Sequence, residues 1–217
     1  MKVPWQNRKM VELVSPLEGY NRWAATYSKE SNPIKDLSDE RIGKFLPDVQ
    51  NKIVLDAGCG TGHFCKLLNE RGASKVIGID ISGAMIEVAK QNCPSVEFRS
   101  EDISIQSLEK ETFDLIICAL VLGHILDIRP ALENLASSLK KGGTILISDF
   151  HPFLTLQHAK RTFEDASGNL YEIKHHLHLF QDIFQCLHQH QIVVETLEEP
   201  LWNDAPVIYA LKAKKNQ

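Results

Sequence analysis

The segment VLDAGCGTGHF, residues 54–64, constrains the fold more than any other part of the chain. Its apolar start is typical of a buried strand, and the residues after its last glycine have the periodicity of a helix. Glycines at Gly58, Gly60 and Gly62 let a ligand approach the backbone where a Cβ atom would collide with it. The helix N-terminus that follows favours a carboxylate or a phosphate. The segment therefore predicts a strand, a ligand-binding loop and a helix.

The pattern of a strand followed by a helix repeats as far as residue 150. Strands are expected at residues 52–58, 75–81, 95–102, 113–122 and 143–150, and helices at residues 63–72, after Ser82 and at residues 130–142. The fourth strand, FDLIICALVL, is almost wholly apolar, which is typical of a strand buried on both faces. The alternation predicts an α/β fold of the Rossmann-like kind, in which a mostly parallel sheet lies between two layers of helices.

Three segments lie outside this repeat. Residues 1–50 contain LEGYNRWAATYSKE, in which two tyrosines and a tryptophan fall on one face of a helix. Residues 151–178 contain RTFED and LYEIKHHLH on either side of ASGN, and this order predicts a β-hairpin inserted after the fifth strand. Residues 179–217 are expected to form a helix and two more strands. We therefore expect one domain with a helical lid, a ligand-binding core at residues 51–150 and an inserted cover.

The composition is that of an ordinary globular domain, with 217 residues of which 43% are hydrophobic. Nothing in MKVPWQNRKM resembles a signal peptide, and the longest apolar run, LIICALVLGHIL, is too short to span a bilayer. The five cysteines show no paired spacing for a disulfide framework or zinc, and a net charge of −4 without a basic stripe disfavours nucleic acid. We expect a cytoplasmic monomer or homodimer with no membrane or nucleic-acid partner.

Two classes of ligand use a glycine loop of this kind. The dinucleotide fingerprint G-x-G-x-x-G has its third glycine one position later, where this chain has His63. Asp80 ends the next strand about twenty residues on, where a carboxylate accepts hydrogen bonds from both hydroxyls of a ribose. Asp102 follows the third strand and can accept from the exocyclic amine of a purine, with Ile81 and Met85 enclosing the base. These positions favour a ligand that contains adenosine; capping of loops is the structural alternative for either aspartate.

The motifs together resemble class I methyltransferases that use S-adenosylmethionine. The resemblance rests on VLDAGCGTG, GIDIS, SEDI, FDLIICALVLGHI and LKKGGTILISDF, in this order between residues 53 and 150. It implies a seven-stranded sheet whose last strand, PVIYALKAK, is antiparallel. The segment YNRWAATY is similar to the tyrosine-bearing segment that closes over the cofactor, which adds Tyr27 to the candidates. The resemblance also implies that the methionine portion is held by Asp56 and the loop from Gly58 to Gly62, the ribose by Asp80, the adenine by Asp102 and Ile103, and that Ala119 forms the edge of the sulfonium pocket.

Methyl transfer needs alignment and exclusion of water more than it needs a general base. His151 and His124 are the candidate bases, because they follow the fifth and fourth strands, and ligands of parallel sheets lie beyond the carboxyl ends of the strands. His151 ranks first because it leads into the hairpin; a hydrogen bond to a loop is the alternative for both. The run His175, His176 and His178 has no evident carboxylate partner, so no metal site is expected.

The methyl acceptor is expected to be a small metabolite. The sequence ALVLGHI contains no N-P-P-Y, D-P-P-Y or Pro-Cys segment of the kind that accompanies methylation of nucleic-acid bases or glutamine amides. The predicted reaction is transfer of a methyl group to an O, N or C atom. An NAD(P)-dependent oxidoreductase and a catalytically silent S-adenosylmethionine-binding subunit are the alternatives. Packing in the core or the lid is the alternative for the apolar and aromatic residues that could form the wall of the acceptor pocket, which are Phe153, Leu154, Phe163, Tyr171 and Trp202.

Overall fold

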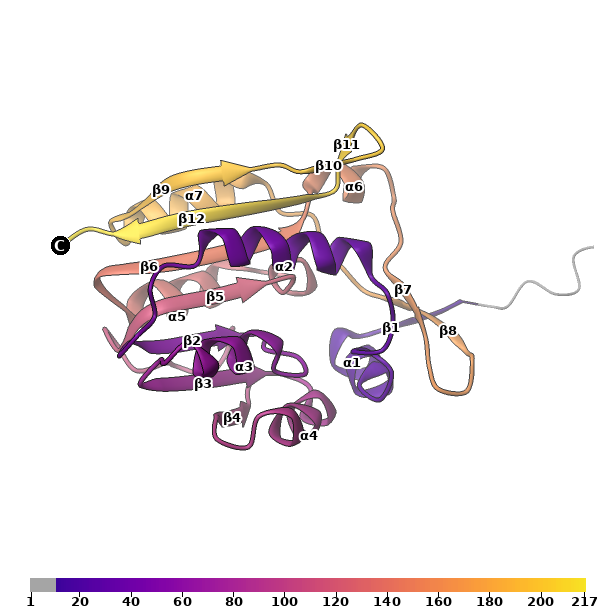
Figure 1. Cartoon of the computed structure of the whole chain (residues 1–217). Helices are drawn as coiled ribbons and strands as arrows, with labels where there is room; N and C mark the ends of the chain where they lie inside the picture. Colours follow the sequence, from indigo (N-terminus) through magenta and orange to yellow (C-terminus); the bar gives the residue numbers. More distant parts are fainter. Residues whose placement is uncertain (1–10) are drawn as a thin grey trace, which may run out of the picture.

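The computed structural model describes residues 11–217, and its centre is a seven-stranded sheet (Figure 1). Residues 1–10, in which no signal peptide is predicted, lie outside the described residues. The strand order is β4-β3-β2-β5-β6-β12-β9, and β12 runs antiparallel to both of its neighbours. This confirms the predicted seven strands with an antiparallel last strand. The strands are β2 (Ile53–Ala57), β3 (Lys75–Asp80), β4 (Glu97–Ser100), β5 (Phe113–Ala119), β6 (Leu139–Phe150), β9 (Ile192–Glu198) and β12 (Ile208–Lys215).

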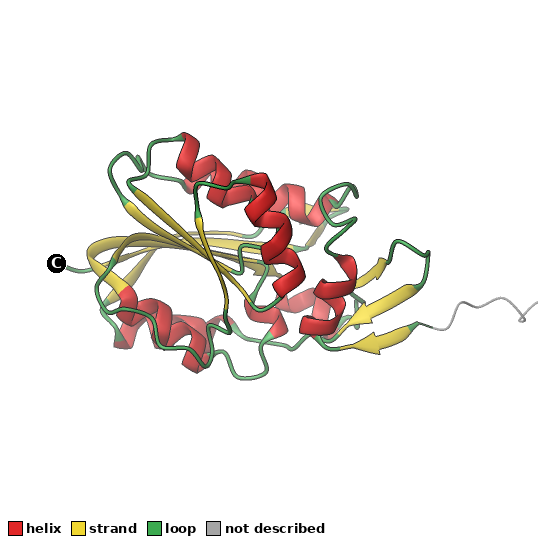
Figure 2. Ribbon diagram, turned by 90° about the horizontal axis from the view of Figure 1, so that it is seen from below, coloured by secondary structure: helices red, strands yellow, loops and turns green. Residues whose placement is uncertain are grey.

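Helices cover both faces of the sheet and give the predicted three layers (Figure 2). Consecutive residues of β5, Leu115 and Ile116, are both fully buried, each in a different hydrophobic cluster. Burial on both faces explains the unbroken apolar run of this strand. Within residues 11–217 we find no helix with the length and apolar character needed to cross a membrane. One face is packed by α2 (Pro33–Phe45), α3 (His63–Glu70) and α4 (Gly83–Asn92), and the other by α5 (Arg129–Ser138) and α7 (Phe180–Gln189).

The helix predicted at residues 130–142 is wrong at its C-terminal end. The strand β6 begins directly after α5, at Leu139, which pairs with Phe113 of β5. The Lys140 ammonium group lies 3.0 Å from the Asp114 carboxylate on β5. The two glycines expected to end the helix lie inside β6. Pairing with the neighbouring strand therefore decides where this helix ends.

A smaller sheet and one helix form a separate layer beyond the carboxyl ends of the parallel strands (Figure 1). The predicted hairpin is present as β7 (Thr162–Glu164) and β8 (Leu170–Ile173). The strand β1 (Glu12–Val14), which was not predicted, pairs in parallel with β8 and leads into α1 (Pro16–Trp23). We call β1, α1, β7 and β8 the cover. Segments that are far apart in the sequence thus form one unit.

The cover has an aromatic core of its own. Trp23 stacks on Phe163 with ring centroids 4.8 Å apart, and Phe163 stacks on Tyr171 at 5.4 Å. Phe163 and Tyr171 are both buried in this core, so packing, and not the wall of an acceptor pocket, is what the structure shows for these two residues. A Cβ atom at Gly19 would lie 2.9 Å from the Ile173 side chain, so glycine allows α1 to approach β8 closely.

Trp23→Ala should lower the free energy of unfolding by about 3 kcal/mol, because it leaves a cavity in the core of the cover. Trp202→Ala is the matched control, since that side chain is 47% exposed against 9% for Trp23; it should change stability by about 0.5 kcal/mol or less. Urea denaturation of both variants measures the difference. If Trp23→Ala lowered the free energy of unfolding as little as Trp202→Ala does, the cover would not unfold together with the rest of the chain.

Candidate active site

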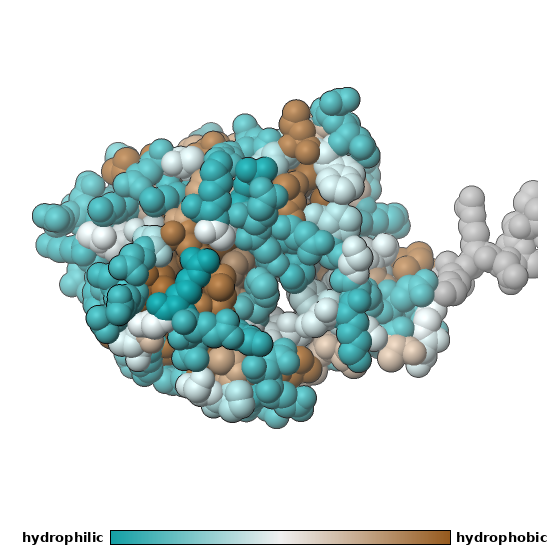
Figure 3. All heavy atoms as spheres, in the orientation of Figure 1, coloured by the Kyte–Doolittle hydropathy of each residue, from teal (hydrophilic) through white to brown (hydrophobic). Residues whose placement is uncertain are grey.

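A cavity of about 450 Å³ lies beyond the carboxyl ends of β2, β3 and β5, and α1 closes one side of it. Figure 3 shows a hollow in this part of the surface, between the sheet and the cover. A smaller pocket of about 50 Å³ adjoins the cavity and adds Asp56. Gly62 and His151 line neither space. The predicted site residues that line the cavity are Tyr27, Gly58, Gly60, Asp80, Ile81, Met85, Asp102, Ile103, Ala119 and His124.

The three glycines of the loop serve different purposes. All three have positive φ angles, which favour glycine. A Cβ atom at Gly58 would lie 2.1 Å from the Val121 side chain, whereas one at Gly60 would meet nothing within 4 Å. At Gly62 it would lie 3.2 Å from Ala89 of α4. Gly60 therefore leaves room on the cavity side, and Gly62 allows α3 and α4 to pack closely.

Asp80 fastens the glycine loop to the end of β3. One carboxylate oxygen accepts the backbone N–H of Gly60 at 2.9 Å, and the other accepts the N–H of Ser82 at 2.8 Å. Burial raises the pKa of Asp80, and these two hydrogen bonds oppose the rise. Each carboxylate oxygen has a further lone pair, so Asp80 can also accept from hydroxyl groups in the cavity.

The four residues predicted to contact the adenine, Ile81, Met85, Asp102 and Ile103, all line the cavity. Asp102 accepts the backbone N–H of Ser104 at 2.8 Å and its hydroxyl at 2.6 Å, both on Oδ1. The other oxygen, Oδ2, remains able to accept from an amine. Met85 and Ile103 are buried, whereas Ile81 is 39% exposed and offers apolar surface to a ring.

Asp56 is a buried carboxylate in the smaller pocket. It accepts a hydrogen bond from the Cys65 thiol at 3.3 Å. Burial, followed by the nearby carboxylates of Asp80 and Asp39, raises the pKa of Asp56 to about 7. Lys35 lines the same pocket and pairs with Asp39 at 2.5 Å. A pocket with a buried carboxylate and a nearby ammonium suits a zwitterionic amino acid. Lys35 and Asp39 were not predicted from the sequence, because no motif contains them. They come near the glycine loop only because α2 packs on the sheet.

The N-terminal segment is hydrogen-bonded both to the glycine loop and to the start of α4. The hydroxyl of Ser28 donates to Thr61 of the loop at 2.9 Å. The hydroxyl of Ser82, which caps α4, donates to the Asn21 side chain of α1 at 2.7 Å. Tyr27 lies beyond the end of α1, in a turn, and lines both the cavity and the smaller pocket. The N-terminal segment therefore forms one wall of the cavity.

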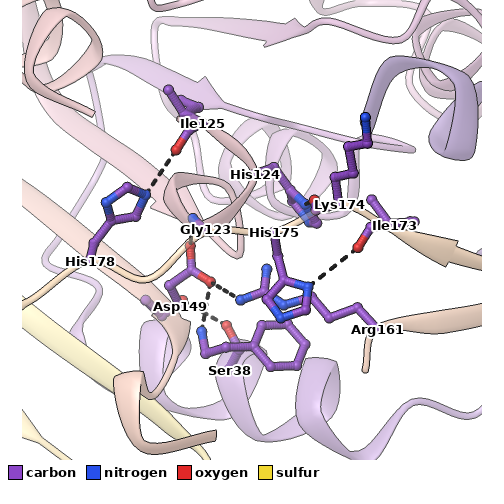
Figure 4. A network of polar contacts seen from close by, with 12 residues as sticks. Ser38, Gly123, His124, Ile125, Asp149, Arg161, Ile173, Lys174, His175 and His178 are labelled. Carbon is purple, nitrogen blue, oxygen red and sulfur yellow. Dashed lines mark hydrogen bonds and ion pairs between the residues drawn. The ribbon is translucent and has the colours of Figure 1, made fainter. Parts of the chain in front are cut away.

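His124 lies on the cavity wall in a short 3-10 helix, η1 (Leu122–His124), directly after β5 (Figure 4). Its Nδ1 lies 3.2 Å from the carbonyl oxygen of Lys174, and its Nε2 lies 2.8 Å from the hydroxyl of Tyr20. Because a carbonyl only accepts, Nδ1 carries the proton and Nε2 accepts from Tyr20. Burial, followed by the positive charge of Arg161, lowers the pKa of His124 to about 4. The imidazole is therefore neutral near pH 7.

His151 does not lie on the cavity wall, so the structure does not support its rank as the first candidate base. Its Nδ1 accepts the backbone N–H of Phe153 at 3.1 Å and so caps α6 (Pro152–Leu156). Its Nε2 lies 2.8 Å from the Glu199 carboxylate. Both ring nitrogens therefore have partners outside the cavity. Phe153, Leu154 and Trp202, expected to form an acceptor wall, do not line the cavity either.

The three histidines after β8 make separate contacts. His178 Nε2 forms a hydrogen bond with the carbonyl oxygen of Ile125 at 2.8 Å, and His175 Nδ1 lies 3.4 Å from the carbonyl oxygen of Ile173. The strand ends at Ile173, so His176 and His178 do not share a strand face. Within residues 11–217, no three His, Cys, Asp or Glu side chains are grouped so that they could hold a metal ion.

Residues 48–203 match the methyltransferase domain family. An uncharacterized protein of Haemophilus influenzae is 29% identical over 190 residues, which cover 74% of this chain and 75% of that protein. A ubiquinone biosynthesis O-methyltransferase of Coxiella burnetii is 34% identical over 104 residues, which are 46% of this chain and only 44% of that enzyme. An S-adenosylmethionine dependent methyltransferase of Mesorhizobium loti shares the fold, with a TM-score of 0.67 and 22% identity over 92% of this chain and 100% of that one.

The family match spans most of the chain and contains all of the motifs from the glycine loop to β6. It therefore decides between the two ligand classes that the glycine spacing allowed, in favour of S-adenosylmethionine over a nicotinamide dinucleotide. The cavity lies where those motifs meet, at the carboxyl ends of the parallel strands. The chain belongs to the class I S-adenosylmethionine-dependent methyltransferases.

Proposed function

We propose that this enzyme methylates an acidic hydroxyl, such as that of a phenol or an enol, on an uncharged and mostly apolar small molecule. The observation that carries the proposal is the hydrogen-bonded pair of Tyr20 and His124 on the wall of the cavity. Tyr20 comes from the cover and His124 from the turn after β5, so the pair forms only when the cover is in place.

The residues around the glycine loop fit S-adenosylmethionine. Asp56 is a buried carboxylate that an α-ammonium group would neutralise, and the open side of Gly60 leaves space beside it. When bound, the cofactor supplies a methyl group that its sulfonium makes electrophilic. The task of the protein is to hold the cofactor, orient it and exclude water. We assign Asp56 and Gly58 to the methionine portion, Asp80 to the ribose, Asp102, Ile103, Ile81 and Met85 to the adenine, and Tyr27 and Ala119 to the junction of the two pockets.

The rest of the cavity supports an uncharged acceptor. Within the described chain, the Asp, Glu, Lys and Arg side chains that line the cavity are all acidic: Asp80, Glu101 and Asp102. A phosphate or carboxylate on the acceptor would find no cation there. Leu17 and Leu126 line the cavity and are 42% and 77% exposed, so an apolar substituent that covered them would be favoured.

The proton of the acceptor hydroxyl would leave through Tyr20. Tyr20 Oη takes that proton as it gives its own to His124 Nε2, which holds the lone pair. Burial and the positive charge of Arg161 lower the pKa of His124, which makes its imidazole a weak base. A weak base suits a hydroxyl that is already acidic, which favours a phenol or an enol over an aliphatic alcohol.

Two further observations support this reading. Some relatives of the chain are named ubiquinone biosynthesis O-methyltransferases, which agrees with an oxygen atom as the acceptor. The 24 Lys and Arg residues are outnumbered by 28 Asp and Glu residues, which agrees with a small acceptor rather than nucleic acid. We also propose that the chain acts in the cytoplasm, as one methyltransferase domain and as a monomer or homodimer.

Affinity for S-adenosylhomocysteine should fall as the pH falls below about 7, because an ammonium group needs the ionised form of Asp56, whose pKa is about 7. The loss approaches tenfold for each pH unit below that value. Calorimetric titrations between about pH 5.5 and 7.5 measure it. Asp56→Asn should bind weakly at every pH, without this dependence. Asp114→Asn, at the other end of the sheet, should keep the wild-type profile. A pH dependence retained in Asp56→Asn would refute the assignment.

Tyr20→Phe and His124→Asn should each lower turnover about 100-fold, the lower end of the range for general acid-base catalysis, and leave the affinity for S-adenosylhomocysteine unchanged. The assay measures methyl transfer to alkyl-substituted phenols and catechols, each paired with an analogue that bears a carboxylate. Only the uncharged members should be methylated. Tyr171→Phe, in the core of the cover, is the control.

Equal transfer to the carboxylate analogues would contradict the acceptor class, and wild-type turnover in either variant would contradict the proton path. Intact cofactor binding without transfer to any phenol would favour a catalytically silent subunit.

A further inference from the structure

A buried ion pair between Asp149 and Arg161 packs against Gly123 of η1 (Figure 4). Arg161, just before β7, reaches from the cover to Asp149 of β6, with Nη2 and Oδ1 3.6 Å apart. Their side chains are only 8% and 3% exposed. Asp149 also accepts the backbone N–H groups of Gly123 at 2.7 Å and Phe150 at 2.6 Å. Neither partner lines the cavity, so the pair cannot touch a ligand there.

The guanidinium group of Arg161 is seated against the turn that carries His124. A Cβ atom at Gly123 would lie 2.6 Å from Nη2 and 2.7 Å from Nη1, so a larger residue there would have to displace the guanidinium group. The guanidinium carbon lies 3.8 Å from the centre of the Phe150 ring. The buried Nη1 has no hydrogen-bond partner within the described residues. A buried charge with an unpaired donor lowers the stability of the fold. Because this charge lies next to the turn that carries His124, it can act on the imidazole.

The hairpin also holds η1 through its own backbone. The N–H of His176 donates to the carbonyl of Gly123 at 2.8 Å, and the carbonyl of Lys174 accepts from Nδ1 of His124. The N–H of Ile173 donates to the carbonyl of Arg161 at 2.9 Å, which joins the two ends of the hairpin. The segment around β7 and β8 therefore contacts η1 at three points: the guanidinium group, one N–H and one carbonyl.

We propose that the inserted hairpin is a positioning device for His124, in which Arg161 and the carbonyl of Lys174 keep the imidazole neutral, with its proton on Nδ1 and its lone pair on Nε2 toward Tyr20. Arg161 is a positioning residue, since it acts through His124 and does not line the cavity. The catalytic use of this tautomer depends on the proposed function, whereas the tautomer and its charge state do not.

The ionisable groups that face His124 come from three elements. Tyr20 lies on α1, Asp149 on β6, and Arg161 and His175 on the inserted segment. Burial lowers the pKa of His124 most, the positive charge of Arg161 is the next cause, and Asp149 opposes both. The two members of the ion pair therefore act on His124 with opposite signs. This difference separates an electrostatic role from a merely structural one.

The test is a titration of the histidine side chains by ¹⁵N NMR on the full chain, without any acceptor. The His124→Asn variant identifies the His124 signals. In the wild type we expect the proton of His124 on Nδ1. We also expect its imidazole to stay neutral when the pH is lowered well below 6.5, the ordinary pKa of histidine. Arg161→Met should raise the pKa of His124 by about one pH unit, and Asp149→Asn should lower it. Arg161→Lys should stay near the wild type. Lys160→Met removes a charge one position away that is 63% exposed and should change nothing.

Loss of one partner can unfold a protein by leaving the other charge buried alone. The double variant Arg161→Met/Asp149→Asn removes both charges, and in it the pKa of His124 should still rise, since Arg161 is the larger of the two influences. An unchanged pKa of His124 in Arg161→Met or in the folded double variant would overturn the proposal, as would a proton on Nε2 in the wild type. If His124 responds as expected but His124→Asn retains full turnover, the proposed proton path fails and the positioning role stands.

Discussion

The carboxylate of Asp80 connects the parts on which the site depends. It accepts from Gly60 in the glycine loop and from Ser82 at the start of α4, and Ser82 in turn donates to Asn21 on the cover. One side chain at the end of β3 therefore fixes the loop, a helix and the wall formed by α1. The parallel sheet supplies the reason for this convergence, because the carboxyl ends of β2, β3 and β5 lie at one edge.

Burial of acidic groups is the cost of this arrangement. It raises the pKa of both Asp56 and Asp80, which means that the surrounding protein disfavours their ionised forms. A ligand that brings positive charge and hydroxyl groups would relieve this cost, and S-adenosylmethionine brings both. The positive charge of Arg161 lies outside the cavity, behind His124, where it acts on the imidazole and not on the ligand.

The sequence was enough to predict the seven strands, the three layers, the hairpin and about half of the cavity lining, because these depend on local periodicity and on motifs at strand ends. It was not enough for features that arise from contacts between distant segments. The pairing of β1 with β8 and the bond between Tyr20 and His124 leave no local pattern. His151 was ranked above His124 because it leads into the hairpin, and only the packing shows that His151 caps α6 and lies beside the Glu199 carboxylate.

A crystal structure with S-adenosylhomocysteine tests the central claim most directly. We predict that the ribose hydroxyls will bond Asp80 and the amino group will bond Asp56. The adenine should lie beside Ile81 and Asp102, and the sulfur should face the part of the cavity that Tyr20 and His124 line. A ligand bound elsewhere, or bound in the cavity with its ribose away from Asp80 and its amino group away from Asp56, would contradict the account.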